Sequence, residues 1–387
     1  MIKLFYFLKL FITAKWIFKY PVKKDILLYD GIKNPFKNDI NKKKLNIYYR
    51  RGEQINIPIL AQCFFFYKFS PSDYLEKYLQ YSKPKLIITA IDNNYGFYKI
   101  SKKYNIKTAF VQSGHRTFCE ADLRSKLIFN KKNKKFFFVD YMFVFNSSMA
   151  KLFSSYISGK TIIIGSYKNN SFNNQKNKKK SKIKEVLFIS SYKPPEFNNY
   201  EVKLGKYTYR YLYKNDKKLI VWLGQICKKY NLKLNILGRN SDAAGDLERK
   251  YYNILLGDNK YSYIKNYHGI KANYLEARKY EYIFTIDSTL GTESFVNFIK
   301  TGFIFNRPFV FPIKTRQFGG MEGFQRAGPN WTTYNNYNEF LRIFKYTISS
   351  SDKKFYNLRN KYYKKIMNFD YKNKIFLSKM KEILDWY

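Results

Sequence analysis

Short continuous apolar runs alternate with stretches of helical periodicity along most of this chain, and this alternation constrains the fold more than any other feature. In the first half the runs are Asp25–Tyr29, Leu45–Tyr49, Lys85–Ala90, Thr108–Val111, Phe136–Phe145 and Thr161–Ile164. The pattern restarts at Glu185–Ser190 and continues through Lys233–Leu237 and Tyr282–Ile286. Such runs are typical of parallel strands that helices cover on both faces. The sequence therefore predicts an α/β protein made of two similar halves.

A polar, lysine-rich stretch, residues 168–184, separates the two halves and is interpreted as a linker. We expect one Rossmann-like domain over residues 23–167, a second over residues 185–337, and a helical tail over residues 338–387. The length of 387 residues fits two domains. Ligands of open α/β sheets bind at the carboxyl ends of the strands. The site is therefore expected in a cleft between the two domains.

Residues 1–22 form a separate N-terminal segment in which Lys3, Lys9, Lys15 and Lys19 interrupt an apolar run. No uncharged stretch here approaches the roughly 20 residues that span a bilayer. On a helical wheel the basic and apolar side chains are partly segregated. This pattern predicts an amphipathic helix, either on an anionic membrane surface or packed on the protein's own body.

The charge balance points to an anionic partner. Lys and Arg number 72 against 28 Asp and Glu, a net charge of +44, which favours nucleotides, phosphates, lipid headgroups or nucleic acid. Most of the basic residues are Lys, whereas nucleic-acid recognition favours Arg, and no RNA-binding motif occurs. Three scattered cysteines and two histidines give neither a disulfide framework nor zinc-ligand spacing, so we expect a cytoplasmic protein without a metal.

The string that follows the Tyr282–Ile286 run is the strongest candidate site. It contains Asp287, Ser288, Thr289, Gly291 and Glu293 and opens a helix. Backbone N–H groups at a helix start favour an anion such as phosphate. A carboxylate in the first turn suits ribose hydroxyls, because it accepts two hydrogen bonds. An ordinary helix-capping box would give a similar string.

A second candidate loop follows the Thr108–Val111 run and contains Gln112, Gly114, His115 and Arg116. We expect Gln112, His115 and Arg116 to project into the cleft. Arg116 could pair with phosphate, and His115 could act as the general base on an acceptor hydroxyl. Asp92, after the Lys85–Ala90 run, is the rival base.

Further basic and polar residues lie just after strands of the second half. Ser191 and Lys193 follow its first strand and Arg239 follows Lys233–Leu237, where they could neutralise a leaving phosphate. His268 lies in a loop before a short helix. In a chain this basic, solvated surface charge is the alternative interpretation of each cation.

The D-S-T-x-G-x-E string after a buried strand resembles the donor-binding loop of GT-B glycosyltransferases and is similar to that of bacterial surface carbohydrate biosynthesis proteins. The Gly328–Thr332 string G-P-N-W-T is also similar to that family, and the Val111–Thr117 loop resembles its Q-N-G-x-R loop with Ser113 in place of Asn. His268 lies where sialyl- and Kdo-type transferases have a His-Pro pair, with Gly269 in place of Pro. The resemblance implies a GT-B-like fold. Its C-terminal half would hold a nucleotide-activated sugar through Ser288, Thr289, Gly291 and Glu293, and its N-terminal half would receive the acceptor.

We therefore expect a metal-independent glycosyltransferase of lipopolysaccharide, capsule or O-antigen synthesis. It would need no cofactor besides its nucleotide-sugar substrate, act on a glycan or lipid-linked acceptor, and lie at the inner face of the cytoplasmic membrane. A polyol-phosphate (glycerol or ribitol phosphate) transferase of similar fold is an alternative. A non-catalytic nucleotide-binding protein is another. An RNA-binding protein ranks last because the sequence contains no RNA-binding motif, and no nucleic acid partner is expected.

Overall fold

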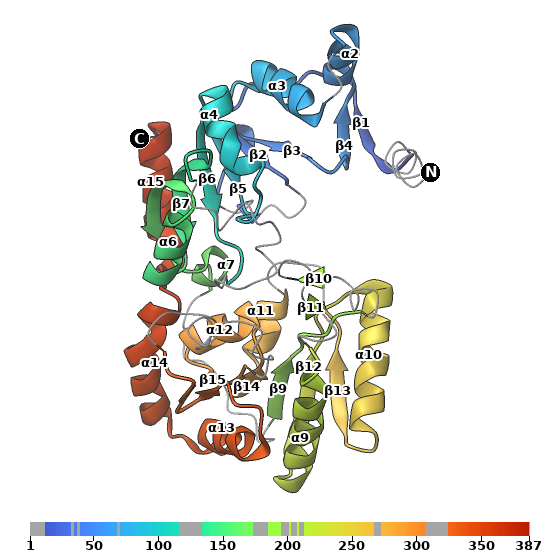
Figure 1. Ribbon diagram of the computed structural model, residues 1–387, viewed down its shortest axis with the longest axis vertical. Helices are drawn as coiled ribbons and strands as arrows, with labels where there is room; N and C mark the ends of the chain where they lie inside the picture. The colour runs from blue at the N-terminus through green and yellow to red at the C-terminus, as the bar shows by residue number, and fades with distance from the viewer. Residues whose placement is uncertain are drawn as a thin grey trace.

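The computed structural model describes residues 12–31, 35–36, 39–67, 70–115, 134–172, 185–194, 201–202, 207–208, 213–266, 272–305 and 324–386. The molecule has two lobes arranged along its long axis (Figure 1). Each lobe is built around one mainly parallel β-sheet. The expected α/β architecture with two parallel sheets and C-terminal helices is confirmed.

The N-terminal lobe contains a six-stranded sheet in the order β3-β2-β5-β6-β7-β8, and every neighbouring pair is parallel. Its strands are β2 (Ile26–Tyr29), β3 (Leu45–Tyr48), β5 (Leu86–Thr89), β6 (Lys107–Val111), β7 (Phe138–Val144) and β8 (Ser158–Ile163). Successive residues of a strand face opposite sides of the sheet. Leu27 and Ile87 therefore join the hydrophobic core on one side, whereas Ile26 and Ile88 join the core on the other.

The first of these cores is covered by α3 (Pro71–Ser82), α4 (Ile100–Tyr104), α6 (Ser147–Ser154) and the short 3-10 turn η2 (Phe97–Lys99). Helix α2 (Ile57–Phe65) and the 3-10 turn η1 (Lys42–Lys44) contribute no residue to that core. A capping box between Ser70 and Asp73, with Pro71 at the first helical position, sets the start of α3. A small parallel pair, β1 (Lys15–Ile17) and β4 (Gln54–Asn56), leads into α2.

The C-terminal lobe contains a seven-stranded sheet in the order β13-β12-β9-β14-β15-β17-β16, parallel except for the β16–β17 pair. Its strands are β9 (Glu185–Ile189), β12 (Lys233–Leu237), β13 (Tyr261–Ile264), β14 (Tyr282–Thr285), β15 (Lys300–Ile304), β16 (Ala327–Gly328) and β17 (Trp331–Thr332). Its helices are α9 (Asp216–Lys229), α10 (Asp242–Leu256), α11 (Ala272–Ala277), α12 (Thr289–Val296) and α13 (Tyr337–Ser349). Two short strands, β10 (Glu201–Val202) and β11 (Tyr207–Thr208), pair with each other.

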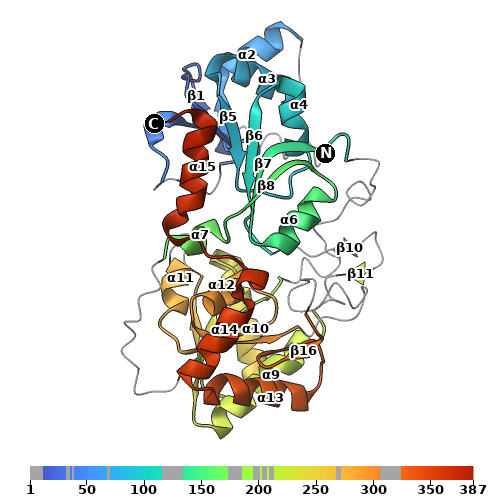
Figure 2. The ribbon, with the colours of Figure 1, turned by 90° about the vertical axis from the view of Figure 1, so that its left-hand side faces the viewer.

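The helical tail is shared between the lobes. Helix α14 (Asp352–Ile366) stays with the C-terminal lobe, and the chain then passes through η8 (Tyr371–Asn373) into α15 (Lys374–Leu384). Helix α15 lies beside the N-terminal sheet (Figure 2). Its Phe376 and Met380 pack in the same core as Ile26 and Leu28. The last helix therefore completes the lobe in which the chain begins.

The chain passes between the lobes twice, and the two passages are bonded to each other. The first contains the short helix α7 (Tyr167–Asn170) and the second contains η8. The buried Asn170 side chain donates to Ile164 O (2.8 Å) and Asn373 Oδ1 (3.0 Å), and its Oδ1 accepts from Asp370 N (3.1 Å). These bonds satisfy the buried amide and fix the passages side by side.

Two sequence-based expectations fail in the described residues. Lys15–Ile17 form strand β1 rather than part of an N-terminal helix, because they pair with β4; residues 1–11 lie outside the described residues. The expected linker also begins too early, because Asn169 and Asn170 are fully buried in α7 and hydrogen-bond to Asn297 and to Ile164 O. Residues 173–184 lie outside the described residues.

Candidate functional site

The loop between β14 and α12 lies at a change of direction in the C-terminal sheet. From β9 the chain builds outward to β12 and β13, and it then returns to the other side of β9 to build β14 and β15. The crevice beside such a switch is where open α/β sheets bind ligands. Asp287 is exposed and Ser288 is half-buried at this point. The sheet topology therefore places the strongest candidate string at a position suited to a ligand.

Helix α12 begins in a way that leaves its start available to an anion. Ser288 is the N-cap with an extended backbone, and among the described residues its side chain makes no capping hydrogen bond to the helix. The first turn of α12 contains no acidic residue. A Cβ on Gly291 would lie 2.4 Å from Thr285 Cγ2, so glycine lets the helix start close against its strand. The positive end of the helix dipole is thus not neutralised from within its own first turn.

A buried glutamine, Gln112, fixes the loop that follows β6. Gln112 Oε1 accepts from Phe145 N (2.8 Å), and its Nε2 donates to Gly114 O (2.8 Å). Gln112 is therefore a support for the loop and does not project outward as the sequence analysis predicts. Its side chain is long enough to bridge two backbone segments. Because the amide group is buried, loss of either hydrogen bond would leave a polar atom without a partner.

Asp92 supports the same loop from β5. Its side chain is completely buried, and Oδ1 accepts hydrogen bonds from Ser113 N (3.2 Å) and Ser113 Oγ (2.9 Å). Ser113, the position that differs from the Q-N-G-x-R pattern, therefore ties Asp92 to the His115 loop two residues before His115. The two base candidates thus lie on neighbouring loops, after β5 and after β6, which these hydrogen bonds join.

The two candidate loops meet across the lobe boundary. The backbone N–H of His115 donates to Thr289 Oγ1 over 3.3 Å, although the residues are 174 positions apart. His115 as a residue is half-buried, but both of its ring nitrogens are buried, and the ring stands edge-on to Phe145, with ring centroids 5.3 Å apart. The carboxyl end of β6 and the start of α12 are thus directly joined, as a site between two lobes requires.

Glu293 has a different environment from the one its position in the string indicates. Its side chain is 2% exposed, accepts a hydrogen bond from Ser166 Oγ of the N-terminal lobe, and bonds with Tyr274. Burial raises the pKa of this carboxyl from 4.5 to about 7, while the hydrogen bonds from Ser166 and Tyr274 and the charge of Lys168 lower it in part. In this arrangement the carboxylate joins the lobes, and a direct contact with a sugar nucleotide stays a prediction.

A second polar group lies after β9, which is next to β14, and after β12, which is on the other side of β9. Arg239 is exposed and its Nη1 donates to Ser191 O over 3.3 Å. Ser191 itself is buried and its hydroxyl donates to Asp216 Oδ2 over 2.9 Å. Adjacent strands lie about 4.8 Å apart, so Ser191, Arg239 and Ser288 follow three neighbouring strands of one sheet edge. Lys193, half-buried, follows Ser191 along the same loop.

Glu248 on α10 organises that second group, and the sequence analysis missed it. Its fully buried carboxylate accepts from Arg239 N (3.0 Å), Asn240 N (2.9 Å) and the Ser190 hydroxyl. The available signal was its spacing, because Glu248 shares one helix face with the buried residues Tyr252 and Leu256. An acidic residue on an otherwise apolar face indicates a buried polar network.

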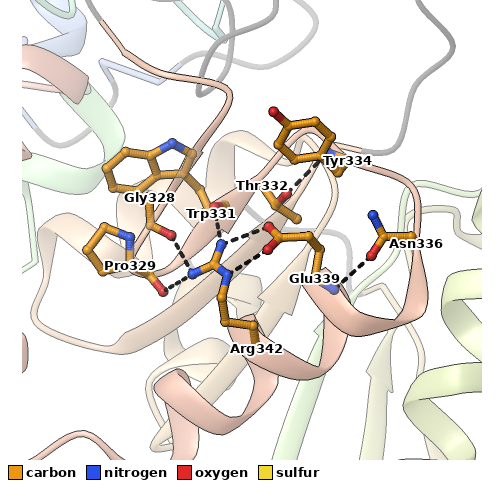
Figure 3. A network of polar contacts seen from close by, with 8 residues as sticks. All are labelled: Gly328, Pro329, Trp331, Thr332, Tyr334, Asn336, Glu339 and Arg342. Atoms are coloured by element: carbon orange, nitrogen blue, oxygen red, sulfur yellow. Dashed lines mark hydrogen bonds and ion pairs between the residues drawn. The ribbon is translucent and has the colours of Figure 1, made fainter.

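The G-P-N-W-T string is a structural clamp rather than part of this group. Arg342 of α13 donates from Nη1 to Gly328 O (2.9 Å) and Pro329 O (3.3 Å) and from Nη2 to Trp331 O (3.3 Å), as Figure 3 shows. The guanidinium also pairs with Glu339 over 2.9 Å. These bonds satisfy the carbonyls of the tight β16–β17 turn and fix it on α13.

Two of the expected site residues, Arg116 and His268, lie outside the described residues. Within the described ranges, no group of three or more His, Cys, Asp or Glu side chains could hold a metal ion. Over the same ranges, no helix combines the length and the hydropathy needed to cross a bilayer.

Comparison with solved structures defines the class of fold. UDP-GlcNAc 2-epimerase of Methanocaldococcus jannaschii is 13% identical, with a TM-score of 0.54 over 93% of this chain and 100% of that one. MnaA of S. aureus is 12% identical, with a TM-score of 0.55 over 95% and 98%. The wall teichoic acid polymerase TagF is 13% identical, with a TM-score of 0.53 over 94% and 90%. The chain thus has a GT-B-like fold like these proteins.

Residues 109–384 match the model of one protein family, whose description is "putative O-antigen biosynthesis protein". This match covers most of the chain, and the protein belongs to that family. The expected relation to surface carbohydrate biosynthesis proteins is confirmed at this level. No curated protein matches the chain by sequence.

Proposed function

We propose that this protein is a glycosyltransferase of cell-surface polysaccharide synthesis that moves a sugar from a nucleotide-activated donor to a glycan or lipid-linked acceptor. The observation that carries the proposal is the hydrogen bond between His115 N and Thr289 Oγ1. It joins a loop of each lobe at the carboxyl ends of the two sheets, where a donor and an acceptor could be brought together.

The C-terminal lobe is proposed to hold the donor. The start of α12 favours a phosphate, and Arg239 and Lys193 on the neighbouring loops add positive charge. Structures of two relatives of this fold contain UDP, which supports a nucleoside diphosphate as the group bound here. The basic groups would stabilise the charge on the leaving diphosphate as the glycosyl–phosphate bond breaks.

The N-terminal lobe is proposed to supply the base. The acceptor oxygen would attack the anomeric carbon while its proton passes to His115 or Asp92, and the nucleoside diphosphate would leave with the bonding electron pair. His115 lies at the lobe boundary, where its backbone N–H bonds to Thr289, whereas Asp92 is fully buried and bonded to Ser113 within the N-terminal lobe. This position, rather than exposure, favours His115 as the group that meets the acceptor.

The test is a binding and transfer assay with a panel of nucleotide sugars. Arg239→Gln is expected to weaken nucleotide binding about tenfold, because a cation beside a diphosphate contributes about 1–2 kcal/mol. Arg249→Gln, the same charge change at an exposed position of α10, is the matched control. Equal binding by the two variants, or no binding of any nucleotide by the wild type, would contradict the proposed donor site.

A polyol-phosphate transferase is the second candidate, because TagF shares the fold and one of its structures carries CDPG. Product analysis separates the activities. A glycosidic bond supports the first proposal and a new phosphodiester supports the second. Conversion of the donor to its epimer without transfer would place the protein with the epimerases of this fold.

A further inference from the structure

Helix α2 carries an unusual number of exposed aromatic side chains. It buries only Ile59 and Cys63 against the lobe. At its end Phe65 is 77% exposed and Tyr67 is 85% exposed, with Phe66 exposed between them. Leaving one such side chain in water instead of burying it costs about 1.5–3 kcal/mol. Contiguous exposure of this kind marks a surface that something covers.

The segment before β4 adds to the same surface. Asn56 Nδ2 donates to Lys19 O over 2.7 Å, and Gln62 Nε2 of α2 donates to Tyr20 Oη over 3.3 Å. These bonds bring residues 18–20 alongside α2, and Phe18 among them is 75% exposed. We call Phe18, Leu60, Phe65, Phe66 and Tyr67 the aromatic face.

Basic side chains accompany the aromatic face. Lys15 and Lys19 are exposed on the adjoining segment, and Lys77 Nζ lies 4.7 Å from the centre of the Phe66 ring. The neighbouring acidic side chains, Glu53, Asp73 and Glu76, are only half-exposed, and Asp73 is engaged in the capping box of α3. Lysine ammonium groups around aromatic rings suit the surface of a lipid leaflet, in which anionic headgroups lie above apolar acyl chains.

The position of the aromatic face suits a flat partner. In both views α2 lies at the end of the N-terminal lobe that is remote from the C-terminal lobe (Figures 1 and 2). A bilayer can approach that end without meeting the lobe boundary where the candidate site lies.

We propose that the aromatic face docks on the surface of a membrane that contains anionic phospholipids. The rings enter the headgroup–acyl boundary while Lys15, Lys19 and Lys77 contact lipid phosphates. Contact is confined to one leaflet, because α2 has nine residues and cannot cross a bilayer. This proposal does not depend on the chemistry of the lobe boundary.

The experiment is co-sedimentation of the full chain with vesicles of phosphatidylcholine alone or with about one third phosphatidylglycerol. The wild type is expected to bind the anionic vesicles at least about tenfold more tightly than the neutral ones, and salt should weaken that binding. Phe65→Ser with Tyr67→Ser should lower affinity about tenfold, since two rings leave the interface. Lys15→Gln with Lys19→Gln should lower it about tenfold or more on anionic vesicles only.

A matched control removes exposed apolar side chains elsewhere. Leu247→Ser with Ile254→Ser on α10 changes two exposed aliphatic residues and should bind vesicles like the wild type. All these side chains are exposed, so thermal melting should change little. Wild-type affinity in the Phe65 and Tyr67 variant overturns the proposal. So does a change of oligomeric state in that variant without lipid, because the face would then bind protein.

Discussion

The buried carboxyl of Glu293 makes the stability of this protein depend on pH in a predictable direction. Burial raises the pKa of Glu293 from 4.5 to about 7 in the folded protein. Between these two pH values the folded state holds a proton that the unfolded state has released. Stability is therefore retained below about pH 4.5 and lost as the pH rises toward 7. The rise of this pKa from 4.5 to about 7 corresponds to a loss of roughly 3 kcal/mol in the free energy of unfolding at pH 8.

Glu293→Gln keeps the shape of the side chain and removes the charge. Replacing the acceptor oxygen that faces Tyr274 or Ser166 by an amide group should cost about 1 kcal/mol at any pH. The variant is therefore expected to be roughly 2 kcal/mol more stable than the wild type at pH 8 and about 1 kcal/mol less stable near pH 4.5. The measurement is the free energy of unfolding in urea at the two pH values and one ionic strength.

The comparison between variant and wild type cancels the titration of every other group. Glu382→Gln is the control, because Glu382 is exposed and its Lys379 partner lowers the pKa of its carboxyl. It should give no gain at pH 8. The reasoning would be refuted if Glu293→Gln and wild type differed in free energy of unfolding by the same amount at both pH values. That result would show that folding does not raise the pKa of Glu293.

Two further predictions concern the framework around the site. Gly165 has φ +73°, and a Cβ there would lie 1.9 Å from Asn368 O, so Gly165→Ala should lower the free energy of unfolding by more than about 3 kcal/mol. Gly257→Ala is the control, because Gly257 has φ +50° and nothing lies within 4 Å of the added Cβ, so the free energy of unfolding in urea should fall by only about 1 kcal/mol. Equal losses in the two variants would contradict the predicted clash with Asn368 O. Arg342→Lys should cost about 2 kcal/mol, because an ammonium cannot bond the three turn carbonyls together, and an unchanged urea midpoint would show that the clamp of Figure 3 adds nothing.

The sequence predicts the strands of the N-terminal sheet and, in the C-terminal sheet, β9, β12 and β14, because the physical signal there is local. The apolar runs at Ile26–Tyr29, Leu86–Thr89 and Tyr282–Thr285 are entirely buried, and a strand covered on both faces needs no polar residues. The N-terminal segment was mispredicted for the complementary reason. Lys15–Ile17 form a strand only because β4, some forty residues later, supplies the hydrogen bonds.

The candidate site shows the same division between local and distant causes. The strand-to-helix turn at Ser288 and the loop at His115 are local features, and their positions after strands were correctly predicted. That Gln112 faces inward, and that Glu293 meets Ser166 of the other lobe, depends on contacts 33 and 127 residues away. No periodicity within one segment contains that information, and the same holds for the role of Glu248.

Because α15 lies in the core of the lobe that the chain builds first, no single cut can divide this protein into two independent units. A fragment ending at the lobe boundary would expose Ile26, Leu28 and their neighbours to water, while the complementary fragment would carry Phe376 and Met380 with nothing to bury them. The N-terminal lobe therefore needs residues from far along the chain, including Trp386, whose indole N–H donates to Asp25 Oδ2 over 3.0 Å. Removing α15 should therefore destabilise the N-terminal lobe, with β2 in its core, before the C-terminal lobe.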